Sequence, residues 1–340
     1  LLSASSTKAA LTLLFAKELL NHLGPKKFLV VAYADIIKKP TGSIKHLHEE
    51  ADTLLALQVI LVGASCSIDV WSPDTDVFIL LMDLVANNRL GSQSELAFVT
   101  GRGAKRRRID LIECVKSLGS KKSKGLVGFH NFTGADWGGK FVGISKKTWI
   151  NAYKNLGEED PALQCFINLG NGPIHASLIN DELPPEISPL EQSTCKVYCK
   201  QGPESLPQLR WHLFQSKNSE GEMLPPTRAA LLPHIVRANY ISTRDKSYVT
   251  PRPQLPHIEE NGWQVKEEKF LPIHCLNPPA PLAVLELRKC GCKVTCGGRC
   301  TCSKHGLPCT PLCKCYGREC TNCAQSSIDA VRIDSDSDED

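Results

Sequence analysis

Between residues 27 and 156, short apolar runs rich in β-branched residues alternate with segments whose apolar positions recur at helical spacing. The short runs predict strands at Phe28–Tyr33, Ser67–Trp71 and Glu95–Thr100. The helical periods predict helices at Glu49–Val62, Ile109–Leu118 and Lys146–Leu156, while Val77–Val85 fits either a helix or a buried strand. Such alternation is typical of an α/β domain with a mainly parallel sheet.

Residues 157–287 are more polar and richer in proline. We expect two short helices between Ser188 and Lys217, and a further helix that reaches Tyr240. Gly262–Ile273 predicts a small hairpin, and Pro278–Pro281 predicts a rigid connector. This part of the chain is therefore predicted to be a helical and proline-rich connecting region.

The lengths of the apolar runs indicate whether the chain could span a membrane. None of them approaches the roughly 18 residues that a spanning helix needs. The longest candidate, Ala9–Leu23, is interrupted by Lys17 and Glu18, which predicts an amphipathic helix packed on a core. The chain begins at a leucine without a secretory signal, so we expect no membrane partner and a reducing compartment.

The cysteines are distributed very unevenly. Of 16 cysteines, 10 lie in the 34 residues from Cys290 to Cys323. Their spacing is C-x-C-x3-C-x3-C-x-C-x6-C-x3-C-x-C-x4-C-x2-C. In a reducing compartment such a density favours thiolates bound to metal. Three zinc ions need about 12 ligand positions, which nine thiolates supply if three of them bridge two ions. Zinc binding would then provide the folding energy of this segment.

The motifs Cys290-Gly-Cys292, Cys296-Gly-Gly-Arg-Cys-Thr-Cys302 and Leu312-Cys-Lys-Cys315 make this block similar to the CXC domain of tesmin-type proteins and of the male-specific-lethal ubiquitin ligase. The resemblance implies a cluster of three zinc ions held by nine cysteines, and binding to the minor groove of DNA. It implies the following zinc ligands: Cys290, Cys292, Cys296, Cys300, Cys302, Cys309, Cys313, Cys315 and Cys320. Cys323 is then the spare thiol, and Arg299 occupies the position of the residue that enters the groove.

Charge supports a nucleic-acid partner for the cysteine block. Residues 288–323 hold 7 lysines and arginines and 1 acidic residue, a net charge of +6. Besides Arg299, we expect Lys293, Lys304 and Lys314 to contact DNA phosphates. Residues 324–340 carry a net charge of −5 and are predicted to be a disordered acidic tail. The alternative is a cluster that only stabilises a surface or buffers metal.

Three short acidic motifs recur near predicted strand ends in the α/β part, namely His48-Glu-Glu-Ala-Asp52, Ser72-Pro-Asp-Thr-Asp76 and Phe132-Thr-Gly-Ala-Asp136. The carboxyl ends of parallel strands meet at one edge of a sheet, so these carboxylates are predicted to converge there. Two Mg²⁺ or Mn²⁺ ions roughly 4 Å apart would hold them and support hydrolysis of a phosphodiester. Each motif alone also fits a helix cap or a turn.

In this order the three motifs resemble the flap-endonuclease and XPG branch of the PIN-like nucleases. The resemblance implies a three-layer sandwich and assigns the metal-binding acids as Glu50, Asp52, Asp74, Asp76 and Asp136. On a regular helix Glu49 shares a face with Asp52, so Glu49 is the alternative to Glu50. The resemblance also makes Gly143 and Lys146 candidate phosphate contacts.

The family's opening strands carry two further aspartates ahead of these motifs. The only aspartate before Glu50 here is Asp35, so we expect the nuclease-like domain to be incomplete at its N-terminus. The predicted organisation is this domain at 1–156, the connecting region at 157–287, the zinc cluster at 288–323 and the tail at 324–340.

The sequence therefore predicts a nuclear, zinc-dependent DNA-binding protein with a nuclease-like domain. That combination would suit a protein derived from a mobile element. The alternatives are an active Mg²⁺-dependent structure-specific endonuclease and a non-catalytic chromatin or transcription adaptor. The basic run Lys105–Arg108 is interpreted either as a nuclear import signal or as a solvated loop.

Overall fold

The chain forms two compact units, Leu1–Leu276 and Asn277–Asp340, which are described separately. In the first unit the computed structural model describes residues 10–11, 13–15, 18, 31–33, 36–39, 42–62, 66–135, 138–217 and 223–276. In the second it describes residues 277, 289–293, 296, 300–304, 306–310, 312–315 and 320–322. The predicted connector Pro278–Pro281 and the acidic tail lie outside the described residues.

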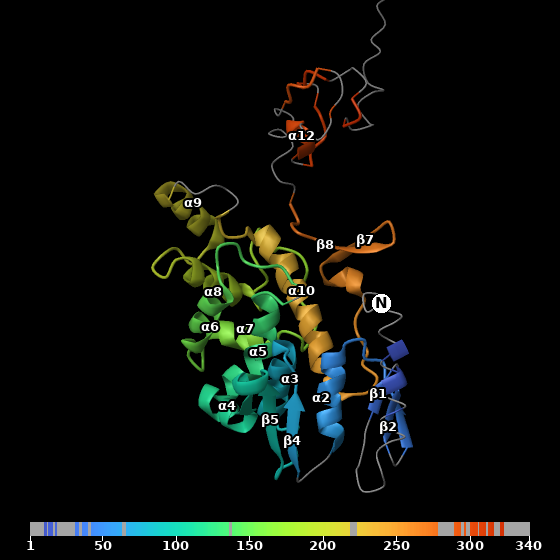
Figure 1. The fold of residues 1–340 in the computed structure, drawn as a ribbon. Helices are drawn as coiled ribbons and strands as arrows, with labels where there is room; N and C mark the ends of the chain where they lie inside the picture. Colours follow the sequence, from blue (N-terminus) through green and yellow to red (C-terminus); the bar gives the residue numbers. More distant parts are fainter. Residues whose placement is uncertain are drawn as a thin grey trace, which may run out of the picture. The chain divides into compact units, whose positions relative to one another are not determined.

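The first unit is a mixed α/β fold (Figure 1), and its described residues form three small sheets. Strands β1 (Val31–Tyr33), β2 (Ile36–Lys39) and β3 (Gly42–Lys45) form an antiparallel meander. The central sheet has the order β4 (Ser67–Trp71), β5 (Glu95–Thr100) and β6 (Arg107–Asp110). A third sheet pairs β7 (Trp263–Lys266) with β8 (Lys269–Pro272) in antiparallel fashion.

The prediction of a mainly parallel sheet was wrong for the described residues. Among them, only β4 and β5 pair in parallel, while β6 pairs with β5 antiparallel. The reason is a tight turn after β5 in place of a crossover helix. Gly101 has a φ of 82° there, and a Cβ at this position would collide with the Lys105 carbonyl. Because glycine has no Cβ, the chain can turn back after β5. The basic run predicted as a loop thus continues into a strand.

Nine longer helices surround the sheets in the described part of the first unit. They are α2 (Ala51–Val62), α3 (Thr75–Ala86), α4 (Leu111–Leu118), α5 (Ser120–Phe132), α6 (Lys146–Lys154), α7 (Pro161–Asn168), α8 (Ser188–Tyr198), α9 (Leu206–Lys217) and α10 (Arg228–Lys246). Three short 3-10 helices are η1 (Gly103–Lys105), η3 (Ser247–Val249) and η4 (Ile258–Asn261). Side-chain caps at Asp74, Asp110, Ser145, Asp160 and Thr227 set five of the helix starts.

The structure decides the ambiguous segment Val77–Val85, which is helical as part of α3. Helices α5 and α7 were not predicted from the sequence. Gly128 explains their close packing, because a Cβ there would collide with the Phe166 carbonyl of α7. A glycine inside a helix costs stability by itself, and here it permits two helix backbones to approach.

The described residues of this unit form two hydrophobic cores. One joins the central sheet to α2, α3 and α4 and includes Leu81, Leu84 and Phe98. The other is aromatic, with Phe132 packed against Trp149 and Phe166, and it includes side chains from α7 to α10. The predicted connecting region therefore contributes α7 to α10 to the same unit as the α/β elements.

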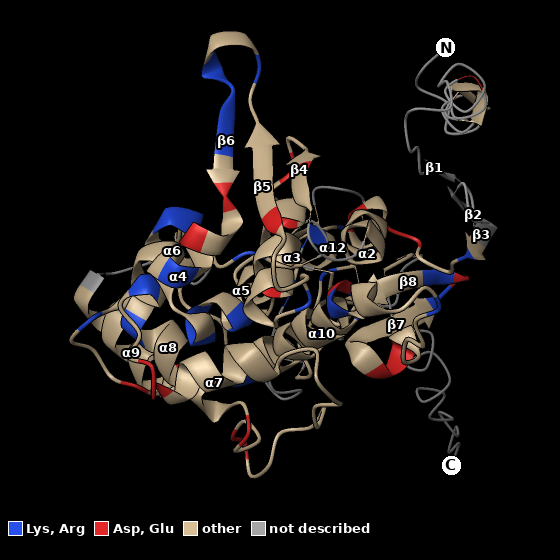
Figure 2. Cartoon of the chain, turned by 90° about the horizontal axis from the view of Figure 1, so that it is seen from below, with Lys and Arg blue, Asp and Glu red and all other residues tan. Residues whose placement is uncertain are grey.

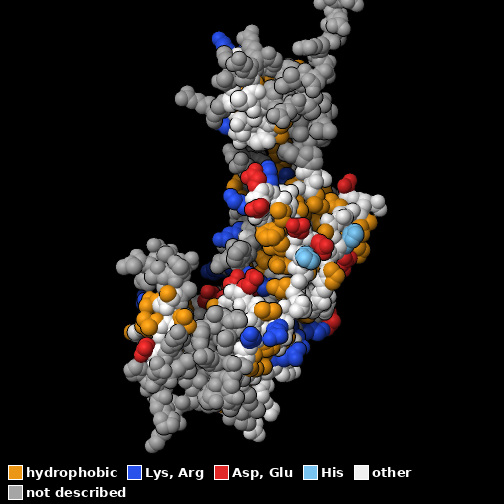
Figure 3. All heavy atoms as spheres, turned by 90° about the vertical axis from the view of Figure 1, so that its right-hand side faces the viewer, with side chains coloured by type: hydrophobic (Ala, Val, Ile, Leu, Met, Phe, Trp, Pro, Cys, Tyr) orange, Lys and Arg blue, Asp and Glu red, His pale blue; other side chains and the backbone are white. Residues whose placement is uncertain are grey.

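The surface of this unit also carries exposed apolar side chains. Hydrophobic groups gather on the face that carries the β7–β8 hairpin (Figure 3), where Val265, Phe270 and Leu271 are exposed. No described helix is long and apolar enough to cross a membrane. Of the predicted helix Ala9–Leu23, residues 10, 11, 13–15 and 18 are helical and the others lie outside the described residues.

The second unit has a core made of cysteines. Its one helix among the described residues is α12 (Thr301–Lys304). Seven thiols are buried, namely those of Cys290, Cys296, Cys300, Cys302, Cys309, Cys313 and Cys315. Of the two leucines described in this part, Leu312 is exposed and Leu307 is only half-buried, so sulfur takes the place that aliphatic side chains occupy in the first unit.

Candidate metal centres

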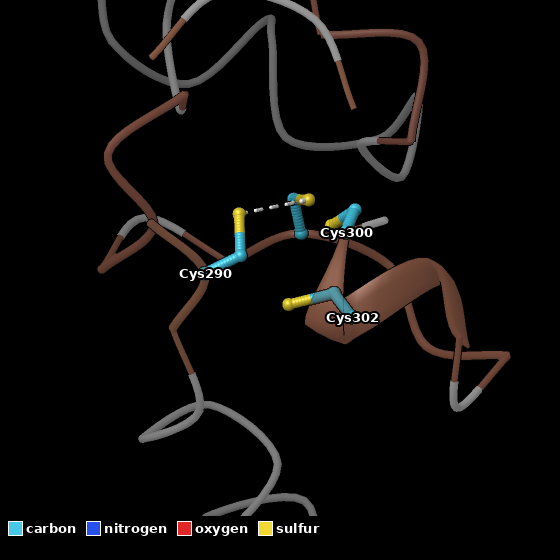
Figure 4. A group of neighbouring side chains, drawn as sticks. Cys290, Cys300 and Cys302 are labelled. Atoms are coloured by element: carbon cyan, nitrogen blue, oxygen red, sulfur yellow. Dashed lines mark hydrogen bonds between the residues drawn. The ribbon is translucent and has the colours of Figure 1, made fainter. Parts of the chain in front are cut away.

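The cysteine unit brings its thiols together in three overlapping groups of four. They are Cys290 with Cys300, Cys302 and Cys309; Cys290 with Cys296, Cys309 and Cys315; and Cys290 with Cys292, Cys296 and Cys300. Within each group the sulfur atoms lie within 4.8 Å of one another. Figure 4 shows the first group, with Cys290 on the extended segment and Cys302 on α12. Cys290 belongs to all three groups, so its sulfur lies at their common centre.

The sulfur separations in the second group match those of a zinc–thiolate tetrahedron. Zinc–sulfur bonds of about 2.3 Å place the ligand sulfurs about 3.8 Å apart. Five of the six sulfur–sulfur separations in this group range from 3.3 to 4.0 Å. The shortest is far longer than the about 2.0 Å of a disulfide bond. The four buried thiols of this group therefore fit a metal such as zinc.

Backbone and side-chain donors surround the sulfurs. The amides of Cys290 and Thr310 each donate to Cys313 Sγ at 3.3 Å. Asn322 Nδ2 donates to Cys309 Sγ at 3.4 Å. At the start of α12, the Ser303 amide lowers the pKa of the Cys300 thiol to about 6. Donors aimed at sulfur stabilise thiolates, which are the form that binds metal.

The other predicted ligands lie around these groups. Cys313 Sγ is 3.7 Å from Cys302 Sγ. Cys320 packs against the cysteine core, and its thiol interacts with Cys309 and Cys315. All nine predicted zinc ligands are thus neighbours in the structure. Arg299 and Cys323 lie outside the described residues. The predicted DNA-contacting residues Lys293, Lys304 and Lys314 are exposed, on the outside of the buried sulfurs.

Three predicted acids meet in the first unit. Asp52 lies in the first turn of α2, Asp74 caps α3, and Asp76 lies in the first turn of α3. One carboxylate oxygen from each lies within 4.8 Å of the other two. Asp74 accepts a hydrogen bond from the Asp76 amide at 2.9 Å, which fixes the loop after β4. The D-x-D spacing thus brings two carboxylates to one helix start, beside the start of another helix.

Two further acids come close, and sequence reasoning missed one of them. Glu50 accepts from Arg244 at 3.1 Å, and Arg244 also bonds Asp245 at 2.9 Å. The carboxylate of Asp245, which is 16% exposed, accepts from Asn131 Nδ2 at 2.8 Å. Asp245 lies in the last turn of α10, about 170 residues after Asp76, in a segment without an acidic motif. No sequence signal distinguishes it from an ordinary helical residue.

The proximity of these acids changes their pKa values. Burial, together with the charges of Asp74 and Asp76, raises the pKa of Asp52 to about 6. Burial also raises the pKa of Asp245. Asp76 differs because His130 Nε2 lies 2.9 Å from its Oδ1, and this contact lowers the pKa of Asp76. Carboxylates that repel each other in this way are suited to bind a divalent cation.

The remaining predicted site residues have varied positions. Asp136 lies outside the described residues. Glu49 is exposed, whereas Glu50 lines the small cavity that also contains Asp52 and Asp76. Gly143 lies in an exposed turn with a φ of 71°. Of the two alternatives, Glu50 thus lies nearer to Asp52 and Asp76 on the cavity lining, where it is paired with Arg244.

Lys146 occupies a different environment from that of a solvated phosphate contact. Its Nζ donates to the carbonyls of His130 and Gly134 at 2.8 and 3.0 Å. Burial lowers its pKa to about 8. The ammonium group thus closes the end of α5 and holds the segment that leads towards Asp136.

A cavity of about 1170 Å³ adjoins Asp74 and Asp76. Phe78, Ile79 and Phe129 form part of its wall, and Lys154 lies on its lining. Ordinary ligand pockets measure about 300 to 1,000 Å³, so this one is large for a small molecule. Asp74 and Asp76 thus lie on the lining of the large cavity.

Comparison with known proteins identified no relative of this chain. No family model, no curated protein and no solved structure matches it. The two candidate metal centres therefore stand on the geometry of the chain itself.

Proposed function

We propose that the protein is a zinc-dependent DNA-binding protein with a nuclease-like domain, and that it acts in the nucleus. The observation that carries the proposal is the set of three overlapping thiol groups centred on Cys290. Overlap is what a cluster with bridging thiolates requires, since a bridging sulfur must lie near two ions at once. Isolated four-cysteine sites would not share members.

Three zinc ions and nine cysteines account best for this arrangement. The nine sulfurs are neighbours, and nine thiolates hold three tetrahedral ions when three of them bridge. The spacing of the block resembles the CXC domain, whose members bind the minor groove of DNA. Exposed Lys293, Lys304 and Lys314 around buried sulfurs suit phosphate contacts, and Arg299 is the proposed groove residue.

An electrophoretic shift with the full chain and duplex DNA tests this proposal. We expect the zinc-loaded protein to bind, and we expect Arg299→Ala or removal of zinc by a chelator to weaken binding at least tenfold. Lys266→Ala, an exposed basic residue on β7, is the control and should bind like the unchanged protein. Equal binding by all samples, or binding by none, would rule out the zinc cluster as a DNA-binding element.

A second candidate is a Mg²⁺-dependent endonuclease, which the convergence of Asp52, Asp74 and Asp76 favours. Within this proposal the first unit is a PIN-like domain of the flap-endonuclease and XPG type, and Glu50 and Asp136 complete the set of acids. A metal held there would bind a phosphate oxygen and activate water. The chain's own contribution is to hold Asp74 and Asp76 on the lining of a cavity of about 1170 Å³.

Cleavage assays on flapped and single-stranded DNA test the second candidate. We expect cutting with Mg²⁺ or Mn²⁺ and loss of cutting in Asp74→Asn, a change that keeps a helix-capping residue. Asp110→Asn is the matched control, because Asp110 also caps a helix but lies outside the carboxylate group. If neither metal supports cutting, the first unit is a non-catalytic scaffold, and the protein acts as a chromatin or transcription adaptor.

A further inference from the structure

The strongest concentration of positive charge lies in the first unit, outside the cysteine block. Residues 101–154 contain 13 lysines and arginines and 3 acidic residues, a net charge of +10. Five of these cations lie on the turn and strand that follow β5. They are Arg102, Lys105, Arg106, Arg107 and Arg108, and all five are exposed. Figure 2 shows this β5–β6 hairpin extending beyond the helices, with its basic residues along the turn and β6.

Backbone hydrogen bonds and strand pairing hold the hairpin in one conformation. Lys105 N donates to Arg102 O at 3.0 Å and Arg106 N donates to Gly103 O at 3.1 Å, which closes the turn. Arg107 and Arg108 are paired with Thr100 and Val99 of β5. A nuclear import signal is recognised as an extended peptide with a free backbone, so this paired strand is poorly suited to that role.

An exposed tryptophan lies beside these cations. Trp71, at the end of β4, is 60% exposed. The Arg106 guanidinium lies 4.8 Å from the centre of its ring, and Arg108 bonds Asp69 at 2.9 Å. Arg102, Lys105 and Arg107 make no ion pair among the described residues, so their charges are available to a partner.

We propose that the β5–β6 hairpin and Trp71 bind unpaired nucleic acid, with the basic side chains on the phosphates and Trp71 stacked on a base. Basic side chains around an exposed aromatic ring are the usual means of binding single strands, because every base has a face that can stack. In a duplex those faces are covered by neighbouring base pairs. An acidic protein would satisfy the charges and would leave the exposed indole ring without a function.

The position of the hairpin adds to the argument. It leaves the sheet at the carboxyl end of β5, and Asp74 follows the carboxyl end of the parallel strand β4. Ser72 N donates to Val99 O at 3.2 Å, which ties the loop leading to Asp74 to the base of the hairpin. A strand held on Trp71 thus lies at the same sheet edge as the carboxylates. This surface is additional to the duplex contact proposed for the zinc cluster.

The test is the anisotropy of a labelled oligothymidine of about 20 nucleotides, titrated with the full chain. We expect Trp71→Ala to weaken binding about tenfold, since stacking on one base contributes about 1 to 3 kcal/mol. Trp211→Ala is the matched control, because Trp211 on α9 is also 60% exposed and has no such cluster of arginines. It should bind like the unchanged protein.

A second variant tests the charges. Replacing Arg102, Lys105 and Arg107 together by glutamate should lower the salt dependence of binding by about 2 logarithmic units per decade of salt. An oligouridine of the same length should bind similarly, and polyglutamate should compete poorly. The proposal would be overturned if both variants bound oligothymidine as tightly as the unchanged protein does. Full competition by polyglutamate would also overturn it.

This outcome is separable from the function proposed above. Chelation of zinc and Arg299→Ala should remove duplex binding and leave oligothymidine binding in place. The hairpin variants should do the reverse. Circular dichroism of Trp71→Ala should match that of the unchanged protein, since an exposed side chain is removed.

Discussion

The two candidate metal centres differ in how the chain assembles them. The cysteine centre draws its ligands from Cys290 to Cys320, a short segment with little apolar core of its own. The carboxylate centre draws on three helices, and Asp245 lies far along the chain from Asp52. The first centre therefore has to create the fold around it, whereas the second is placed by a fold that exists without it.

Removal of zinc should produce the largest difference between the two units. Structural zinc contributes about 10 kcal/mol or more to small metal domains, so the cysteine unit should unfold when a chelator removes the metal. The first unit should be unaffected. All five tryptophans lie before residue 277, so tryptophan fluorescence reports on the first unit alone.

Limited proteolysis measures the response of the cysteine unit in the same sample. Cleavage after Lys293, Lys304 or Lys314 should become rapid in the chelator, while the urea midpoint seen by tryptophan fluorescence stays the same. A shift of that midpoint on chelation would contradict the independence of the two units.

Replacement of Arg244 should have the next largest effect. Arg244 bonds both Glu50 and Asp245, so Arg244→Ala leaves the largely buried Asp245 carboxylate, which is 16% exposed, without its cation. We expect the free energy of unfolding of the first unit to fall by about 3 kcal/mol at pH 7. Arg252→Ala, at an exposed arginine, is the control and should change little.

The pH dependence of this variant sharpens the test. Burial raises the pKa of Asp245 in the folded protein above its unfolded value. Protonation of Asp245 therefore favours the folded state. The loss of unfolding free energy in Arg244→Ala should shrink as the pH falls from 7 towards about 4. Urea unfolding at several pH values measures this loss of unfolding free energy. An equal loss at pH 7 and pH 5 would contradict the role given to Arg244.

The close contact of α5 with α7 predicts a smaller effect that is confined to the first unit. Gly128→Ala places a Cβ against the Phe166 carbonyl and 2.9 Å from Leu169 Cβ, which should cost about 1 to 3 kcal/mol. Gly157→Ala has no atom within 4 Å of the new Cβ and should be nearly neutral. Urea unfolding compares the two variants, and an equal response would show that α5 and α7 do not need the glycine.

The same contrast explains which features could be predicted from the sequence. Ligands that lie close in the chain are readable from spacing, and all nine predicted cysteines are neighbours in the structure. The D-x-D motif likewise identified Asp74 and Asp76, because a helix start fixes both. Asp245 and His130 reach the acids only through tertiary packing, and no local pattern marks them.

The errors in the fold have equally specific causes. The basic run continues into β6 at Arg107 because Gly101 lets the chain turn back after β5, which a count of charged residues does not reveal. Helix α5 was missed because Gly125 and Gly128 lower its helix propensity, and its partner α7 supplies the compensating contact. Strand β6 depends on pairing with β5, and helix α5 depends on packing against α7. Neither contact can be read from the local sequence pattern.

The most direct test of the central claim is the number of zinc ions bound by the full chain, measured by native mass spectrometry. The account predicts three ions per chain, three again in Cys323→Ser, and fewer in Cys309→Ser, since Cys309 belongs to two of the three thiol groups. One ion per chain, or a zinc content that Cys309→Ser leaves unchanged, would contradict a bridged thiolate cluster and with it the proposed DNA-binding module.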